Sequence, residues 1–158
     1  RGRDLLLRSA GKTKAIREKE IEKHLRFYKT YMTGIKNCEQ QLDYIMPTMI
    51  PRYEGNNDSG FWVVNNTEKV AIDRIESFRA LELREEIERY KILTHSIENA
   101  VEALEMVERA FVHLRYFECK SISEVAHALG YAEEKSIYRI RRNTLDKLSI
   151  SLKGLLIL

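Results

Sequence analysis

The residues best suited to recognise a ligand lie near the C-terminal end of the chain, where basic and polar side chains cluster. They are Lys135, Ser136, Tyr138, Arg139, Arg141, Arg142 and Lys147. An arginine guanidinium can pair bidentately with a guanine edge in the major groove, while further lysines and arginines neutralise phosphates. Each good base contact contributes about 1–3 kcal/mol of discrimination between base pairs. The cluster therefore predicts binding to double-stranded DNA.

The sequence around this cluster has the pattern of two short helices joined by a tight turn. We expect the first helix to bury Val125, Ala126 and Leu129, and Ala126 is small enough to let a second helix cross closely. Gly130 follows at the point where the chain needs a left-handed conformation. The core-facing residues of the second helix share one side, and they are Ile137, Ile140, Thr144, Leu145 and Leu148. The pattern predicts a helix-turn-helix whose second helix presents its basic side to the major groove.

Two points about this motif stay open at the level of sequence. Glu133 and Glu134 stand where a capping Ser or Thr is usual, so Ser136 is an alternative N-cap that would leave Lys135 in the loop. A pair of short helices with a glycine turn, whose arginine-rich side is simply exposed to solvent and binds no DNA, would have a similar sequence pattern. The agreement of small residue, turn glycine, apolar spacing and basic cluster favours the DNA-binding interpretation.

Other chemistries lack their sequence signatures. The chain has no phosphate-cradling glycine loop, no serine nucleophile elbow and no HExxH pattern, and its carboxylates follow helical faces. The 4 histidines show no metal-ligand spacing, and the 2 cysteines, Cys38 and Cys119, match no CxxC pattern. We therefore expect no enzyme, no cofactor and no metal site, and unpaired thiols that suit a reducing cytoplasm.

The elements that must position the basic cluster are expected to be helices. Of 158 residues, 44% are hydrophobic and 32% are charged, with only 7 Gly and 2 Pro, a balance typical of helix-rich proteins. Apolar side chains recur at helical steps from Thr13 to Met46 and again from about Asn66. The stripe expected on the second helix consists of Ile72, Ile75, Phe78, Ile87, Tyr90 and Leu93. Turn-forming residues at 47–66 predict an irregular loop between the two helices.

The sequence thus predicts an all-α protein with an N-terminal long-helix hairpin followed by a C-terminal helix-turn-helix domain. We place the hairpin in residues 1–95 and the DNA-binding domain in residues 96–158, with a helix break near His95 to Asn99. No apolar run is long enough for a signal peptide or for a membrane span of about 18 residues. We expect a cytoplasmic, nucleoid-associated protein with no membrane contact.

The net charge of +3 is small, but basic residues gather near the two ends of the chain. The basic N-terminal segment, which includes Lys14 and Arg17, is either an arm that follows phosphates or a plain solvated terminus.

Residues Arg109 to Leu148 resemble region four of bacterial sigma factors. The resemblance lies in Leu114-Arg115-Tyr116, in the Ser-Glu-Val-Ala sequence at 123–126 and in the Ile-Tyr-Arg-Ile-Arg-Arg sequence at 137–142. The whole layout, with the Asn-Thr-Glu-Lys-Val-Ala-Ile segment at 66–72, is similar to the ArpU and RinA families of phage late-gene regulators. This resemblance implies promoter binding and recruitment of RNA polymerase. It places Lys135, Ser136, Tyr138 and Arg139 at base-reading positions and Arg142 near phosphate.

The function expected from the residues is a sequence-specific DNA-binding transcription regulator. The resemblance implies, more narrowly, a phage or prophage late-gene activator acting at promoters with RNA polymerase. The N-terminal helices would contact RNA polymerase or a second copy of the chain in a homodimer. One alternative is a DNA-binding phage packaging component similar to a small terminase subunit, which would assemble into a ring. Another is a sigma-like protein that binds polymerase without reading DNA.

Overall fold

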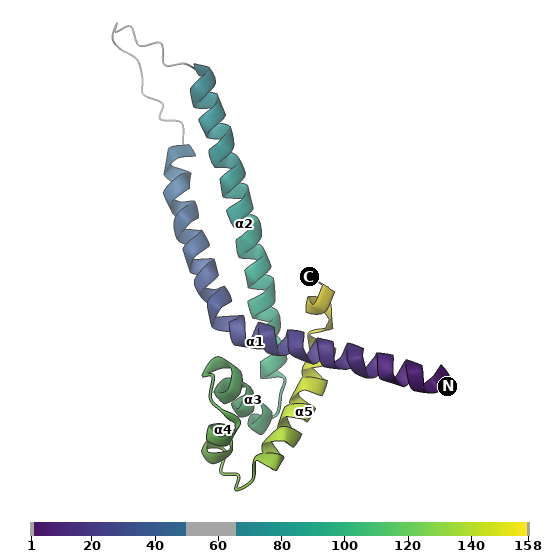
Figure 1. Ribbon diagram of the computed structural model, residues 1–158. Coiled ribbons are helices and arrows are strands. Elements are labelled where there is room, and N and C mark those ends of the chain that lie inside the picture. The colour runs from purple at the N-terminus through teal and green to yellow at the C-terminus, as the bar shows by residue number, and fades with distance from the viewer. Residues whose placement is uncertain (1, 50–65, 158) are drawn as a thin grey trace, which may run out of the picture. The chain divides into compact units, whose positions relative to one another are not determined.

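The computed structural model describes residues 2–49 and 66–157, and the regular elements in these ranges are all helices (Figure 1). In chain order they are α1 (Gly2–Met49), α2 (Asn66–Glu102), α3 (Met106–Val112), the π-helix η1 (His113–Phe117), α4 (Ile122–Ala128), α5 (Glu134–Ser151) and the 3₁₀-helix η2 (Lys153–Ile157). The predicted all-α class is confirmed for these residues. Residues 50–65, most of the predicted loop, lie outside the described residues. Within the two described ranges, no helix combines the length and apolar content needed to cross a bilayer.

The chain forms two compact units, and both long helices contribute to each of them. The larger unit contains Arg1–Tyr31 and Ile92–Leu158, and the smaller unit contains Met32–Lys91. The first part of α1 therefore packs with the C-terminal helices, while its last part packs with the first part of α2.

In the smaller unit, the segments of α1 and α2 run antiparallel. Gly34 of α1 lies against the ring of Tyr90, where an added Cβ would come within 2.9 Å of the ring. Farther along α1, Ile45 shares a hollow with Arg79, which lies earlier in α2. The segments bury apolar residues between them, namely Ile35, Ile45, Ala80 and Ile87.

The apolar residues of α2 in this unit occupy two different faces, so the single stripe predicted for them is wrong. Ile72, Ile75 and Phe78 are 50%, 68% and 70% exposed, whereas Ile87 is buried. Phe78 and Ile87 are nine residues apart, which is two and a half turns at about 3.6 residues per turn and puts them on opposite sides. The face toward α1 instead follows alternating steps of four and three residues, through Glu76, Ala80, Leu83, Ile87 and Tyr90.

The larger unit has a core built from both ends of the chain. Its almost fully buried apolar residues are Ile21, Leu25, Ile97, Phe111, Val112, Tyr116, Val125, Ile137, Leu145 and Leu148. Leu152 and Leu155 are also buried. Burying a side chain of this size stabilises the fold by about 1.5–3 kcal/mol. The first part of α1 is therefore a structural partner of the C-terminal helices.

The helix break that we expected near His95 to Asn99 is absent, because α2 continues to Glu102. Neither Gly nor Pro occurs in that segment, and Ile97, Ala100 and Val101 continue the buried face at helical spacing. The chain turns only after Glu102, where Arg109 donates hydrogen bonds to the carbonyl oxygens of Glu102 and Leu104 at 2.6 and 3.1 Å. These bonds satisfy carbonyl groups that have no partner at a helix end.

Candidate nucleic-acid interface

The first helix of the candidate site, α4, begins with a reciprocal capping box. The Ser121 hydroxyl accepts a hydrogen bond from the Glu124 backbone N–H at 3.2 Å, and the Glu124 carboxylate accepts one from the Ser121 N–H at 2.7 Å. The backbone hydrogen bond from Ser121 lowers the pKa of Glu124 below its usual value. The cap fixes the start of α4 because it satisfies two backbone donors that a helix end otherwise leaves free. The predicted inward residues Val125 and Ala126 are buried, and Leu129 is half-buried.

The turn after α4 has the hydrogen bonds of a Schellman motif. The Tyr131 N–H donates to the Ala126 carbonyl at 2.9 Å, and the Gly130 N–H donates to the His127 carbonyl at 3.1 Å. Gly130 has a φ of 75°, in the left-handed region that glycine enters without steric cost. The left-handed conformation predicted for Gly130 is confirmed, and it lets the chain leave α4 sharply toward α5.

The second helix of the site, α5, begins at Glu134 with Glu133 as its N-cap residue. The alternative start at Ser136 is therefore wrong, and Lys135 belongs to the first turn of the helix. No side-chain hydrogen bond from Glu133 caps this end, but Glu134 lies in the first turn, where the helix dipole favours negative charge. The apolar side of α5 buries Ile137, Thr144, Leu145 and Leu148, as predicted, while Ile140 is half-buried.

Four of the seven predicted DNA-binding residues form one exposed stripe, which we call the basic face of α5: Lys135, Tyr138, Arg139 and Arg142. They follow one another at steps of three, one and three residues, so they share one side of the helix. All four are exposed, Tyr138 by 52%. Together with Glu133 and the half-buried Ser136 they line a shallow hollow of about 360 Å³.

The three cations of the basic face form no ion pair with any other described side chain. A fourth cation, Lys14 of α1, lies nearby on a different element, and its Nζ is 2.8 Å from Asp146 Oδ1 of α5. The hydrogen bond with Asp146 raises the pKa of Lys14, and the positive charge of Arg142 opposes that rise. The basic face of α5 therefore continues toward α1, although Lys14 is itself paired.

Arg141 lies on a different side of α5, where it forms an ion pair with Glu22 of α1. Its Nε and Nη2 lie 3.0 and 2.8 Å from Glu22 Oε1, and the buried Tyr116 hydroxyl donates to the same oxygen at 2.7 Å. Partial burial lowers the pKa of Arg141, but the hydrogen bond and the charge of Glu22 outweigh this effect and raise it overall. Burial and the hydrogen bond to Glu22 both raise the pKa of Tyr116. Arg141 therefore joins α5 to α1 and η1.

Lys147 is also paired within the protein, with two carboxylates at the start of α3. Its Nζ lies 2.8 Å from Glu108 Oε2 and 3.2 Å from Glu105 Oε1. The hydrogen bonds that Lys147 donates to Glu108 and Glu105 raise its pKa. Glu108 is buried and also accepts the Glu105 N–H at 3.2 Å, so Lys147 supports the cap of α3.

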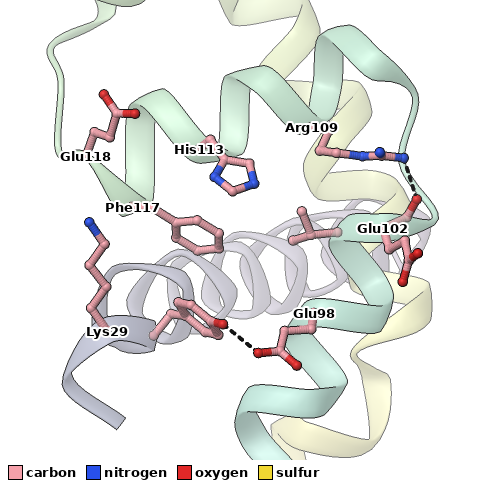
Figure 2. Close-up of a pocket in the computed structure, with 9 residues that line it drawn as sticks. Lys29, Glu98, Glu102, Arg109, His113, Phe117 and Glu118 are labelled. Atoms are coloured by element: carbon pink, nitrogen blue, oxygen red, sulfur yellow. Dashed lines mark hydrogen bonds between the residues drawn. The ribbon is translucent and has the colours of Figure 1, made fainter. Parts of the chain in front are cut away.

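A larger hollow, of about 380 Å³, lies among α1, α2, α3 and η1 within the larger unit (Figure 2). Phe117 stacks on Tyr28 with ring centroids 4.8 Å apart and meets the His113 ring edge-on at 4.9 Å. The Tyr28 hydroxyl donates to Glu98 at 2.6 Å, and burial together with this bond raises the pKa of Tyr28 to about 12. These contacts hold η1 against α1 and join α1 to α2, directly before the chain enters α4.

Sequence patterns could have revealed part of this network. Ser121 and Glu124 have the spacing of a capping box, and Arg141 follows Ile137 by four residues, on the core side of α5. Glu22 gave no such signal, because it lies 94 positions from Tyr116 and 119 from Arg141.

No protein-family model, curated protein or solved structure matches this chain significantly. The resemblance to sigma region four and to the ArpU and RinA families therefore stays a prediction. Among the described residues, no group of three or more His, Cys, Asp or Glu side chains is placed to hold a metal ion.

Proposed function

We propose that this protein is a sequence-specific DNA-binding transcription regulator that inserts α5 of a helix-turn-helix into the major groove. The observation that carries the proposal is the basic face of α5. Three cations and a tyrosine stand exposed on one side of a helix, and the opposite side of that helix is buried in the core. A helix held in this way can present side chains to base edges with little loss of conformational entropy on binding.

The role that we propose for each side chain follows from its position along α5. Residues near the N-terminus of a recognition helix contact base edges, so Lys135, Ser136 and Arg139 are assigned to base reading. Arg142 lies one turn farther along and is assigned to phosphate. Tyr138 is exposed beside them and offers both a hydroxyl and an apolar ring, the latter suited to a thymine methyl.

We assign Arg141 and Lys147 to the support of α5 and not to DNA contact. Arg141 is paired with Glu22, and Lys147 with Glu105 and Glu108. A cation already paired with a carboxylate gains less from a phosphate, because the existing ion pair must first be broken.

The finer proposal is that the protein is a phage or prophage late-gene activator that acts at promoters with RNA polymerase. The sigma-like sequence at 109–148 supports it. A packaging protein of the small-terminase kind would differ by assembling into rings. A polymerase-binding sigma mimic would differ by having no base-dependent affinity.

The decisive experiment is selection of binding sites from a random duplex pool at about 150 mM salt, a concentration that weakens sequence-independent phosphate attraction. It is repeated with Arg139→Ala, Arg142→Ala and the control Arg26→Ala, which removes an exposed arginine from α1. Arg139→Ala should cost about 1–3 kcal/mol of binding free energy and relax the preference at one or two positions. Arg142→Ala should weaken binding to all DNA sequences alike, and it should reduce the salt dependence of the affinity by about one released counterion.

Enrichment of a motif that changes with Arg139→Ala and survives Arg26→Ala would support the proposal. Failure to enrich any sequence, with binding that fades uniformly as salt rises, would refute base reading by α5.

A further inference from the structure

α2 carries a second apolar surface that the core of the smaller unit does not use, which we call the outer stripe. It consists of Ala71, Ile75, Phe78 and Leu81, and all four residues are exposed, Leu81 by 53%. These residues lie about half a turn from the face of α2 that packs on α1. A contiguous exposed stripe of large apolar side chains is typical of a protein interaction surface.

The residues of the outer stripe are arranged symmetrically around Phe78. Ile75 and Leu81 lie three residues before and after it, and Arg74 and Glu82 lie four residues before and after it. Positions three and four residues apart share one side of a helix, so the two charges flank the apolar stripe. Arg74 and Glu82 are both exposed, and neither forms an ion pair with another described residue.

We propose that the outer stripe binds the outer stripe of a second copy of this chain, with the two α2 helices antiparallel and Phe78 at the two-fold axis. In an antiparallel pair, each residue faces the one at an equal distance on the other side of the axis. Ile75 then meets Leu81 of the second copy, and Arg74 meets Glu82 of the second copy. Each apolar contact and each ion pair occurs twice.

Charge complementarity selects a second copy over an unrelated partner. A parallel pairing would place Arg74 beside Arg74 and Glu82 beside Glu82, so like charges would oppose it. Only the antiparallel arrangement satisfies both charges with residues of the same sequence. The proposal concerns the smaller unit alone and does not depend on DNA binding by α5.

The test uses the full 158-residue chain and measures its association constant by sedimentation equilibrium. The native chain should sediment as a dimer of 18.6 kDa subunits. Arg74→Glu and Glu82→Arg should each weaken the dimer by about tenfold or more, since each replaces two attractive pairs with two repulsive ones. Phe78→Ala should weaken it by about a hundredfold, because a central aromatic residue is lost from both subunits. Lys36→Glu, the same charge reversal on an exposed position of α1, is the control and should have no effect.

A mixing experiment separates pairing from misfolding. In an equimolar mixture of the Arg74→Glu and Glu82→Arg chains, every facing pair is again of opposite charge, so heterodimers should form although each variant alone is mostly monomeric. The doubly substituted chain should likewise recover native affinity. A native chain that stays monomeric at all concentrations would overturn the proposal. So would a dimer that is insensitive to Phe78→Ala, or a mixture that fails to associate.

Discussion

The contact between Glu22, Tyr116 and Arg141 should contribute strongly to the stability of the larger unit, and replacing Glu22 with Ala tests this. Glu22 is largely buried, with its side chain 14% exposed, and one of its oxygens accepts hydrogen bonds from both Tyr116 and Arg141. Its removal leaves the hydroxyl of the buried Tyr116 without an acceptor, which costs about 1–3 kcal/mol. The ion pair with Arg141, whose side chain is 33% exposed, adds about 1 kcal/mol or less because water screens it.

The expected loss in the free energy of unfolding for Glu22→Ala is therefore about 1–4 kcal/mol. Urea denaturation followed by circular dichroism measures it, with Glu22→Gln as an intermediate case because the amide oxygen still accepts from Tyr116. Arg141→Ala should lower the free energy of unfolding by about 1 kcal/mol or more, since the aliphatic part of the arginine side chain also contributes packing. Arg139→Ala, on the exposed face of the same helix, is the matched control and should change stability by less than about 0.5 kcal/mol.

A double-mutant cycle decides whether Glu22 and Arg141 interact directly. The effects of Glu22→Ala and Arg141→Ala should fall short of additivity by about 0.5 kcal/mol or more. Unfolding of Glu22→Ala at the same urea concentration as the native chain would refute a stabilising role for Glu22. A loss of stability in Arg139→Ala as large as that in Arg141→Ala would refute the role of the ion pair.

Three further predictions concern single positions of the same unit. Gly130→Ala should destabilise the protein by about 1 kcal/mol through backbone strain alone, because φ is 75° and an added Cβ would meet nothing within 4 Å. Thermal denaturation measures this, and Gly130→Asn should cost less because asparagine tolerates the left-handed region. Thr144→Val should be neutral or stabilise by up to about 1 kcal/mol, since the Thr144 hydroxyl is buried without a hydrogen-bond partner among the described residues. A clear loss of stability in Thr144→Val would mean that the hydroxyl does have a partner. Tyr116→Phe should cost about 1 kcal/mol near neutral pH, and its difference from the native chain should shrink above about pH 10.

The sign of the Tyr116 effect follows from the direction of its pKa shift. Burial and the bond to Glu22 raise the pKa in the folded protein, whereas an unfolded tyrosine loses its proton near about pH 10. The native contribution is therefore complete below that pH and is lost as the pH rises toward the folded pKa. Urea unfolding of both proteins at neutral and alkaline pH measures the change, and a difference that stayed constant would contradict it.

Local features of the candidate site were predictable because they depend on neighbours in sequence. Gly130 has no side chain and is followed by a new helical pattern, so its left-handed turn could be expected. The burial of Ile137, Leu145 and Leu148 on one side of α5 follows from helical spacing in the same way. The break near His95 was wrong because the buried face continues through Ile97, Ala100 and Val101, and neither Gly nor Pro interrupts the helix there.

The sequence by itself determined the helical character of this protein and the side of α5 that carries Lys135, Tyr138, Arg139 and Arg142, because both depend on residues within a few turns of one another. Only the tertiary structure decided that Arg141 and Lys147 are paired inside the protein, since their carboxylate partners lie far away in sequence on α1 and α3. It also decided which apolar stripe of α2 is buried. Helical spacing allows either face of α2 to pack on α1. Which face is buried depends on the shape of the partner helix, and the local sequence pattern of α2 does not contain that information.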